Sequence, residues 1–260
     1  MIKEPKNLKA KKSLGQHWLT SIKAVEKIIT VAEIKPKDAV LEIGPGRGIL
    51  TAKLLEARAL VWAIEKDRRL IADLQEKFTS AIKNNQLHLI EADIIDFNIN
   101  KLPSKYKLVA NIPYYLTGQI FRKFLSAKNK PALITLLIQK EVAQRIVAKN
   151  DKESLLSLSV KAYGQPKIEA IVKAGSFSPS PKVDSAILSI KNISNDFFKN
   201  LDEQKFFEVI RICFGQKRKQ IKSVLKIEGQ KLKTIGLADT IRPEDLKLTD
   251  WPKLISIIND

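Results

Sequence analysis

The sequence predicts an α/β fold with a doubly wound, mostly parallel sheet, an antiparallel hairpin at the sheet edge and a small all-helical C-terminal domain. Between residues 39 and 148, short β-branched apolar runs alternate five times with helical periodicity or a loop, which is typical of a parallel sheet with crossover helices. Two further strand-like runs, 167–177 and 185–193, lie too close together for a crossover helix and predict the hairpin. After about residue 195 only helical spacing remains.

The predicted elements follow one another in a regular order. Residues 21–33 have the spacing of an amphipathic helix. Five segments then each begin with a predicted strand and continue into a helix or a loop: 39–57, 59–78, 87–97, 106–125 and 131–148. The hairpin completes a first domain, 1–195, which includes a basic N-terminal segment, 1–20. The helical domain is predicted over 196–260.

The charge balance favours a polyanionic partner. The 260 residues include 46 Lys and Arg against 28 Asp and Glu, a net charge of +18, and such an excess is usually tolerated because the partner is a nucleic acid. An anionic membrane surface is the weaker alternative, since no basic segment adjoins an exposed apolar helix and no apolar run could span a bilayer. The N-terminus lacks the apolar core of a secretory signal, and a single cysteine, Cys213, excludes an intrachain disulfide or a cysteine-based zinc site. We therefore expect a cytoplasmic protein without a metal site.

A glycine-rich turn follows the first predicted strand. Gly44, Gly46 and Gly48 allow a tight turn and let a ligand lie against the backbone, although close helix–strand packing explains such a turn equally well. Glu65 ends the next strand, where a carboxylate can accept both hydroxyls of a ribose. The glycine spacing is tighter than that of dinucleotide-binding enzymes and resembles the first motif of S-adenosylmethionine-dependent methyltransferases. In such enzymes Asp93, at the end of the third strand, would hold the adenine amine; an NAD enzyme is the alternative.

The fourth strand ends in Asn111, Ile112, Pro113 and Tyr114, which taken alone could be an ordinary turn. In a methyltransferase this position lies beside the methyl donor. An aromatic amine is a poor nucleophile and needs acceptors for its N–H groups, which the Asn111 side-chain oxygen and the Ile112 carbonyl can provide. Pro113 adds no competing N–H, and Tyr114 can stack on a flipped-out base. The four residues therefore predict a site for methyl transfer to a base amine.

Together these segments resemble the small-subunit ribosomal RNA adenine dimethyltransferase family from end to end. The matching motifs are KKSLGQHWL (11–19), VLEIGPGRGILT (40–51), NIPYYLT (111–117), FSPSPKVDSAIL (177–188), FGQKRKQIKSVL (214–225) and IRPEDL (241–246). The resemblance implies a Rossmann-like class I methyltransferase fold and S-adenosylmethionine as cofactor.

The resemblance also implies roles for single residues. The implied cofactor contacts are His17, Leu19, Gly44, Gly46, Glu65, Asp93 and Asn111. Asn111, Ile112, Pro113 and Tyr114 would surround the target amine, with Phe177 on the second face of the base. Two departures stand out: His17-Trp18 replaces a common Asn-Phe, and Gly118-Gln119 replaces a common Ser-Pro. The alternatives are a core aromatic for Phe177 and a solvated tail for residues 1–12.

Residues 214–226 predict a basic amphipathic helix. Phe214, Ile221, Val224 and Leu225 would form its apolar stripe, with Arg218, Lys222 and Lys226 on another face. Such a face is often only solvated, but on a +18 chain we expect it to contact RNA phosphates.

We predict the dimethylation of two adjacent adenosines near the 3′ end of small-subunit rRNA, linked to small-subunit biogenesis. The expected substrate is rRNA within a pre-assembled small subunit, and the protein is expected to be a monomer with no membrane partner. One alternative is a large-subunit rRNA methyltransferase of the macrolide-resistance type. The other is a ribosome-assembly factor that acts mainly by binding.

Overall fold

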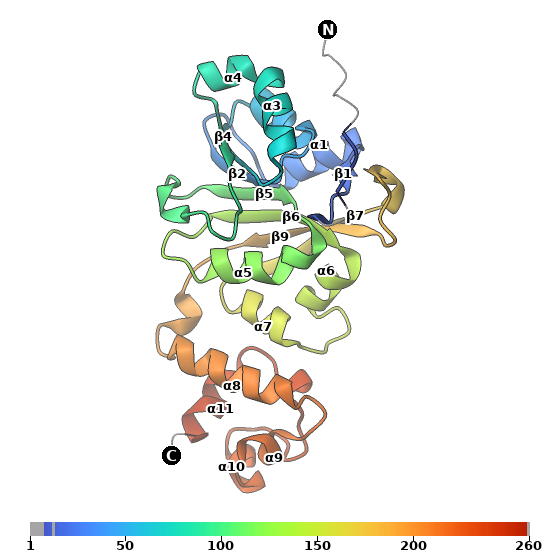
Figure 1. Ribbon diagram of the computed structural model, residues 1–260. Coiled ribbons are helices and arrows are strands. Elements are labelled where there is room, and N and C mark those ends of the chain that lie inside the picture. The colour runs from blue at the N-terminus through green and yellow to red at the C-terminus, as the bar shows by residue number, and fades with distance from the viewer. Residues whose placement is uncertain (1–7, 12–13, 259–260) are drawn as a thin grey trace. The chain divides into compact units, whose positions relative to one another are not determined.

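The computed structural model describes residues 8–11 and 14–258, which form two compact units (Figure 1). The first comprises residues 1–143 and 166–193, and the second comprises 144–165 and 194–260. The second unit thus includes residues 144–165, which the sequence analysis assigned to the first domain. Hydrogen bonds from the Tyr163 hydroxyl to Glu203 and from the Glu153 amide to the Glu244 carbonyl attach this stretch to the C-terminal helices.

The first unit is built on a sheet with the strand order β4-β3-β2-β5-β6-β9-β7 (Figure 1). The strands are β2 (Ala39–Ile43), β3 (Leu60–Glu65), β4 (Leu87–Glu91), β5 (Lys107–Asn111), β6 (Leu133–Gln139), β7 (Gln165–Val172) and β9 (Ser185–Lys191). The strands β2 to β6 are parallel, and β9 runs antiparallel to β6. The predicted doubly wound, mostly parallel sheet with an antiparallel edge is confirmed, with β9 on the inner side of the last strand pair.

Helices cover both faces of this sheet (Figure 1). They are α1 (Ile22–Val31), α2 (Ile49–Glu56), α3 (Arg68–Lys77), α4 (Thr79–Lys83), α5 (Thr117–Leu125) and α6 (Lys140–Val147), the last of which crosses the boundary between the units. Val40, Val61 and Val109 face the core that contains α1, α2 and α3. Alternate residues such as Leu41 and Leu108 are also fully buried, since successive side chains of a strand point to opposite faces. The parallel strands are therefore largely apolar on both sides.

A small second sheet joins two segments that are distant in sequence. β1 (Trp18–Leu19) pairs antiparallel with β8 (Phe177–Ser178), with Trp18 opposite Ser178 and Leu19 opposite Phe177. This pairing was not predicted from the sequence, because two-residue strands carry no periodicity. It brings the segment around His17 to the loop that follows β8, where the His17 Nδ1 lies 2.7 Å from the Pro179 carbonyl oxygen.

The second unit is helical, and its described residues from 196 to 258 contain no strand. Its helices are α7 (Leu155–Lys161), α8 (Glu203–Gly215), α9 (Ile221–Leu225), α10 (Gly229–Thr234) and α11 (Asp250–Ile258). Phe206 and Trp251 are fully buried at its centre and pack edge to face. None of the described helices in either unit has the length and hydrophobicity needed to span a bilayer.

The single helix predicted across residues 214–226 is wrong. α8 ends at Gly215, the chain turns, and α9 begins only at Ile221. The amide of Ile221 donates to the distant carbonyl of Ile241 instead of to a residue one helical turn before it. Lys226 then ends α9 in the left-handed conformation, with φ 55°. Arg218 therefore lies in a turn, and the three basic residues do not share one helix face.

Candidate active site at the carboxyl ends of the parallel strands

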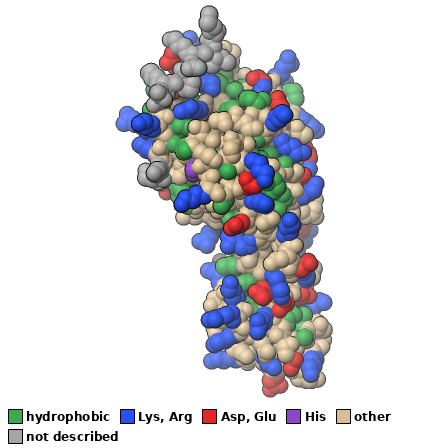
Figure 2. Space-filling model, turned by 90° about the vertical axis from the view of Figure 1, so that its right-hand side faces the viewer, with side chains coloured by type: hydrophobic (Ala, Val, Ile, Leu, Met, Phe, Trp, Pro, Cys, Tyr) green, Lys and Arg blue, Asp and Glu red, His purple; other side chains and the backbone are tan. Residues whose placement is uncertain are grey.

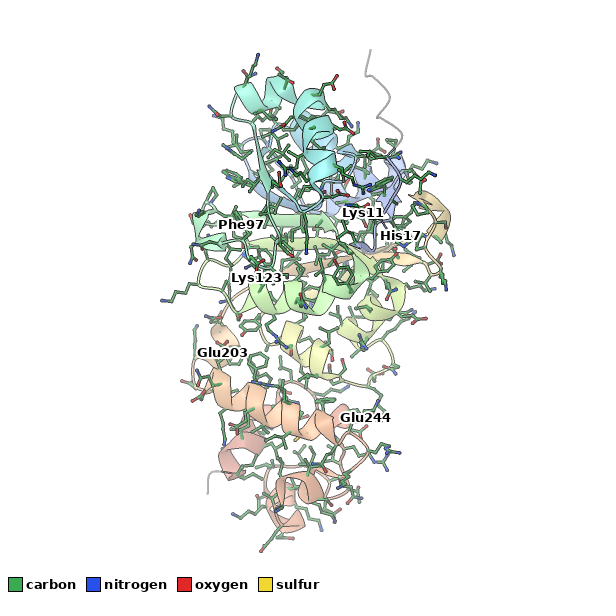
Figure 3. The ribbon with its side chains drawn as sticks, viewed as in Figure 1. Lys11, His17, Phe97, Lys123, Glu203 and Glu244 are labelled. Carbon is green, nitrogen blue, oxygen red and sulfur yellow. The ribbon has the colours of Figure 1, made fainter. Side chains whose placement is uncertain are left out.

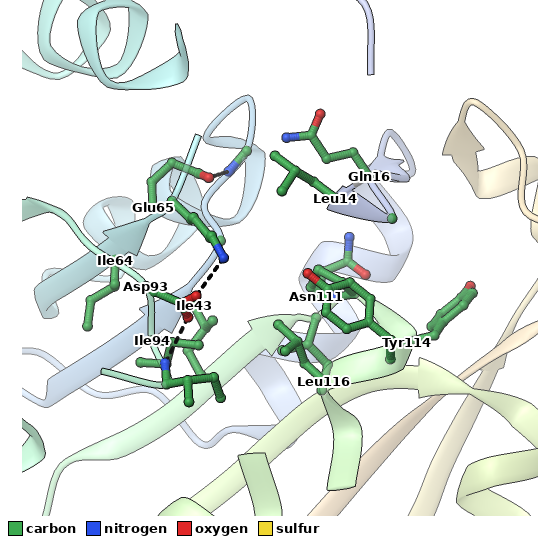
Figure 4. A pocket seen from close by; sticks show the side chains of 18 of the residues that line it. Leu14, Gln16, Ile43, Ile64, Glu65, Asp93, Ile94, Asn111, Tyr114 and Leu116 are labelled. Carbon is green, nitrogen blue, oxygen red and sulfur yellow. Dashed lines mark hydrogen bonds and ion pairs between the residues drawn. The ribbon is translucent and has the colours of Figure 1, made fainter. Parts of the chain in front are cut away.

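A pocket of about 350 Å³ opens at the carboxyl ends of β2, β3 and β5. This is the edge where open α/β sheets bind their ligands. In Figure 4, Glu65 and Asp93 lie on one side of the pocket and Asn111 and Tyr114 on the other, with Leu14 and Gln16 above them. The predicted site residues that line the pocket are His17, Gly44, Gly46, Glu65, Asp93, Asn111, Ile112, Pro113 and Tyr114.

The turn after β2 contains three glycines, of which Gly44 and Gly48 have different structural roles. All three have positive φ, at 64° for Gly44, 57° for Gly46 and 73° for Gly48. A Cβ on Gly44 would meet nothing within 4 Å, so this backbone faces open space and a ligand can lie against it. A Cβ on Gly48 would lie 2.6 Å from the ring of Phe78, so this glycine is required by the packing of α3 against the turn.

We expect Gly48→Ala to lower the melting temperature much more than Gly44→Ala. Both replacements place a methyl group at positive φ, but only the Gly48 methyl collides with Phe78. Overpacking of this kind destabilises by about 1–3 kcal/mol. Thermal unfolding of the two variants checks this, and equal losses would contradict the packing role of Gly48.

Glu65 is the buried acceptor of the site, with 6% of its surface exposed. One oxygen accepts from the Gly46 amide at 3.1 Å, and the other accepts from the Asp67 amide at 2.8 Å. Burial raises the pKa of Glu65 above its ordinary value, and the two backbone donors only partly offset this effect. Since a carboxylate has about four acceptor positions, two remain for a ligand that carries two hydroxyls.

Asp93 presents a second, more exposed carboxylate. Lys66 lies 2.6 Å from one oxygen, and the Ile95 amide donates to the other at 2.9 Å, as the dashed lines in Figure 4 indicate for this side of the pocket. The hydrogen bond from Lys66 is the main reason that the pKa of Asp93 is below its ordinary value. Asp93 is therefore a stable anion that can accept from an amine, beside the apolar side chains of Ile64 and Ile94.

Glu42, the acid two residues before Gly44, does not line the pocket. It is 1% exposed and accepts a 2.7 Å hydrogen bond from the Thr51 hydroxyl in α2. Burial raises its pKa to about 8. Its contact joins β2 to the first turn of α2, so it supports the glycine turn from behind.

Asn111 is oriented by the N-terminal segment. Its side-chain nitrogen donates to the carbonyl of His17 at 3.0 Å. This bond identifies the donor end of the amide, so Oδ1 is the end that can accept from an N–H entering the pocket. Asn111 was predicted from the sequence, but its contact with His17 was not, since the two residues are ninety-four positions apart.

Tyr114 is held in place through its hydroxyl group. Its hydroxyl lies 2.9 Å from the hydroxyl of the buried Ser185 in β9, and burial raises its pKa. The ring is nearly parallel to that of His17, with centroids 6.1 Å apart and an interplanar angle of 20°. Tyr114 thus offers a flat face at a set position, which suits the stacking of a base.

Two of the predicted cofactor and base contacts do not line the pocket. Leu19 and Phe177 are each 5% exposed and pack in the core under the β1–β8 pair. The alternative of a core aromatic describes Phe177 as it stands here, because strand pairing draws its ring inward. Its contact with a base stays a prediction. The solvated tail predicted for residues 1–12 falls mostly outside the described residues; Leu8 packs against the core and its carbonyl accepts from Arg47.

The pocket also contains residues that the sequence analysis missed. Gln16 donates to Asp67, which is 3% exposed and whose pKa is lowered mainly by its hydrogen bonds with Arg69. Tyr115, 57% exposed, stands at the pocket wall next to Tyr114. Both Gln16 and Tyr115 lie inside motifs quoted above, KKSLGQHWL and NIPYYLT, so their place in these motifs was the available signal.

Three consecutive basic residues of the second unit lie on one turn. Lys217, Arg218 and Lys219, here called the basic turn, are all exposed between α8 and α9. Lys226 is also exposed, whereas Lys222 lies 3.5 Å from Asp239. On the face that Figure 2 shows, Lys and Arg side chains are spread over both units with acidic side chains among them.

Known proteins resemble this chain over almost its whole length. A family model described as "Ribosomal RNA adenine dimethylase" matches residues 7–260. The chain is 39% identical to Ribosomal RNA small subunit methyltransferase A of Dehalococcoides mccartyi, over 95% of this chain and 88% of that protein. It is 40% identical to the protein of the same name in Mycoplasmopsis synoviae, over 96% and 97% of the two chains.

Two solved structures share the fold. A dimethyladenosine transferase from Plasmodium falciparum superposes with a TM-score of 0.80 at 28% identity, over 94% of this chain and 98% of that one. The 23S rRNA methyltransferase ErmE superposes with a TM-score of 0.77 at 24% identity, over 94% and 100% of the chains. The predicted Rossmann-like class I methyltransferase fold is confirmed.

Proposed function

The chain belongs to the ribosomal RNA adenine dimethylase family, and on this premise we propose that it dimethylates two adjacent adenosines near the 3′ end of small-subunit rRNA with S-adenosylmethionine. One observation carries the proposal. A single pocket joins Glu65, a buried carboxylate suited to a ribose, to the Asn111–Tyr114 segment, which is suited to a base amine.

The residues present fit S-adenosylmethionine. Glu65 retains two acceptor positions for the ribose hydroxyls, and Asp93 can accept from the adenine amine. The backbone of Gly44 faces open space, where the chain of a cofactor can pass. The cavity of about 350 Å³ is within the usual range of cofactor sites.

The protein's own contribution is positioning. Bound S-adenosylmethionine supplies a methyl group that is already activated on its sulfonium sulfur. Asn111 Oδ1 and the Ile112 carbonyl accept from the N–H groups of the target amine, which frees the nitrogen lone pair for attack. Tyr114 holds the base by stacking, and Pro113 stiffens the segment and adds no donor.

Several features support the small subunit as the source of the substrate. The relatives at 39% and 40% identity are named as small-subunit enzymes, whereas the 23S enzyme, at 24%, shares only the fold. We further propose that the protein acts as a monomer in the cytoplasm on rRNA within a pre-assembled small subunit. An assembly factor that acts mainly by binding is the second candidate, which the charge of +18 favours.

Methyl transfer to defined substrates tests the proposal. The purified protein with radiolabelled S-adenosylmethionine is offered unmethylated small subunits, large subunits, and naked rRNA from each. We expect incorporation into small subunits, with mass spectrometry locating dimethyladenosine in adjacent pairs near the 3′ end. Incorporation into large subunits alone would assign the large-subunit activity. Tight binding to small subunits without incorporation would favour the assembly factor.

We expect reversal of the basic turn, Lys217→Glu, Arg218→Glu and Lys219→Glu together, to weaken small-subunit binding and flatten its salt dependence. For each phosphate that the protein no longer neutralises, the slope of log affinity against log salt falls by roughly one unit. The single reversals Arg218→Glu and Lys222→Glu, which change the charge equally, are compared as a control; Lys222 is already near Asp239 and should contribute less. Binding titrations over a salt series check this, and an unchanged slope would remove the basic turn from the interface.

A further inference from the structure

Trp18 carries a buried donor that is not satisfied by the described part of the chain. Its indole Nε1 is buried, and among the described residues it has no hydrogen-bond partner. The residue is 8% exposed and lines the pocket. Leaving a buried N–H unpaired costs about 1–3 kcal/mol, so such a group is expected to have a partner in the working protein.

The geometry shows where that donor lies. A Cβ built on Gly46 would be 3.1 Å from Trp18 Cδ1 and 3.5 Å from Nε1, so this edge of the indole faces the glycine turn. The Arg47 guanidinium lies over the indole ring, 4.1 Å from its centroid, and Arg47 Nε also lacks a partner within the described ranges. Of these two residues only Trp18 lines the pocket, so its indole N–H is the donor on this wall, and the guanidinium adds positive charge against the ring.

Three acidic side chains line the pocket, Glu65, Asp93 and Asp96, and one oxygen of Glu65 is already bonded to the Gly46 amide. Glu65 and Asp93 are on the side that Figure 4 shows to the left of Asn111. A carboxylate of a bound ligand would be repelled by these acidic side chains, whereas at Trp18 it would meet an indole N–H that has no other partner among the described residues. An indole N–H can only donate, and its natural partner is therefore an acceptor such as a carboxylate oxygen.

The N-terminal segment holds Trp18 in this place. The neighbouring His17 carbonyl accepts from Asn111, and Trp18 itself pairs with Ser178 in the small sheet. Figure 3 shows Lys11 and His17 on the same side of the first unit, where Lys11 also approaches Asp67 at 3.7 Å. The indole is therefore placed before any ligand arrives, which reduces the entropy lost on binding.

We propose that Trp18 is a cofactor-binding residue whose indole N–H donates to the carboxylate of the methionine moiety. This rests on the proposed use of S-adenosylmethionine. The interaction adds a charge-assisted hydrogen bond at the end of the cofactor away from the adenine. It also makes affinity depend on the amino-acid part of the ligand.

A pair of ligands isolates this hydrogen bond. S-adenosylhomocysteine has the carboxylate, whereas 5′-methylthioadenosine keeps the adenosine and sulfur but lacks the amino-acid part. By calorimetry we expect Trp18→Phe to weaken the binding of S-adenosylhomocysteine roughly tenfold. The affinity for 5′-methylthioadenosine should change by less than about twofold. Equal losses for both ligands, or no loss for either, would overturn the inference. A wild-type protein that binds neither ligand would overturn the proposed function as well.

A measurement on the wild-type protein covers the case in which Trp18→Phe does not fold. Protein labelled with ¹⁵N-tryptophan gives indole signals for Trp18, Trp62 and Trp251, which Trp62→Phe and Trp251→Phe assign by elimination. We expect S-adenosylhomocysteine to move the Trp18 indole proton downfield and 5′-methylthioadenosine to leave it nearly in place. An identical response to both ligands would overturn the inference.

Discussion

Asn111→Ala is expected to suppress methyl transfer on the order of 100-fold while binding to the small subunit survives. The target amine loses one of its two acceptors and the nitrogen is no longer aligned with the donor methyl, and misplacement of this kind costs about that much. Subunit binding is spread over a large basic surface, so it does not depend on one amide. Methyl incorporation, subunit binding and melting temperature are measured on the same preparations.

Tyr114 provides the controls for this experiment. Tyr114→Phe keeps the stacking ring and loses only the bond to Ser185, so it should retain most activity with a modest loss of stability. Ser185→Ala removes the same bond from the other side and should match it, whereas Tyr114→Ala should lose activity as Asn111→Ala does. A folded Asn111→Ala protein that binds the subunit and turns over normally would end the catalytic assignment of Asn111. In that case the bond to His17 would be a structural one.

Glu65→Gln is expected to weaken S-adenosylmethionine binding at neutral pH by about 1–3 kcal/mol, since one acceptor becomes a donor facing the ribose. The wild-type affinity should also fall at acid pH. Burial raises the pKa of Glu65, so as the pH falls it takes up a proton earlier than an ordinary glutamate, and the protonated form accepts poorly. The wild-type protein should therefore begin to lose affinity at a pH above the usual titration range of glutamate, and Glu65→Gln should show no such pH dependence.

Asp93→Asn is the matched control for the pH dependence. Lys66 lowers the pKa of Asp93, so that carboxyl stays ionised where Glu65 is already titrating. Asp93→Asn should weaken S-adenosylmethionine binding at all pH values but should keep the loss of affinity at acid pH. Calorimetry across a pH series measures both. If the loss of affinity at acid pH persisted in Glu65→Gln and disappeared in Asp93→Asn, Asp93 and not Glu65 would be the carboxylate whose protonation weakens binding.

Much of the fold was predictable because the signals are local. The run 39–43 and the glycines after it predicted a strand and a turn, and both are present as β2 and the positive-φ glycines. The predicted helix over 214–226 failed for the opposite reason. The spacing of its apolar residues suited a helix, but the Ile221 amide donates to the Ile241 carbonyl and not to a carbonyl of the preceding turn. No periodicity in a single stretch records such a distant partner.

The alternation of strands and helices could be read from the residues alone, and with it the meeting of Gly44, Glu65 and Asn111 at one edge of the sheet. This follows because the carboxyl ends of parallel strands must lie together. Three features are visible only in the folded chain: His17 orients Asn111, Phe177 packs inward, and the edge of Trp18 faces the glycine turn. Those features depend on the pairing of β1 with β8, a pairing between segments far apart in the chain whose free energy comes from packing and not from local propensity.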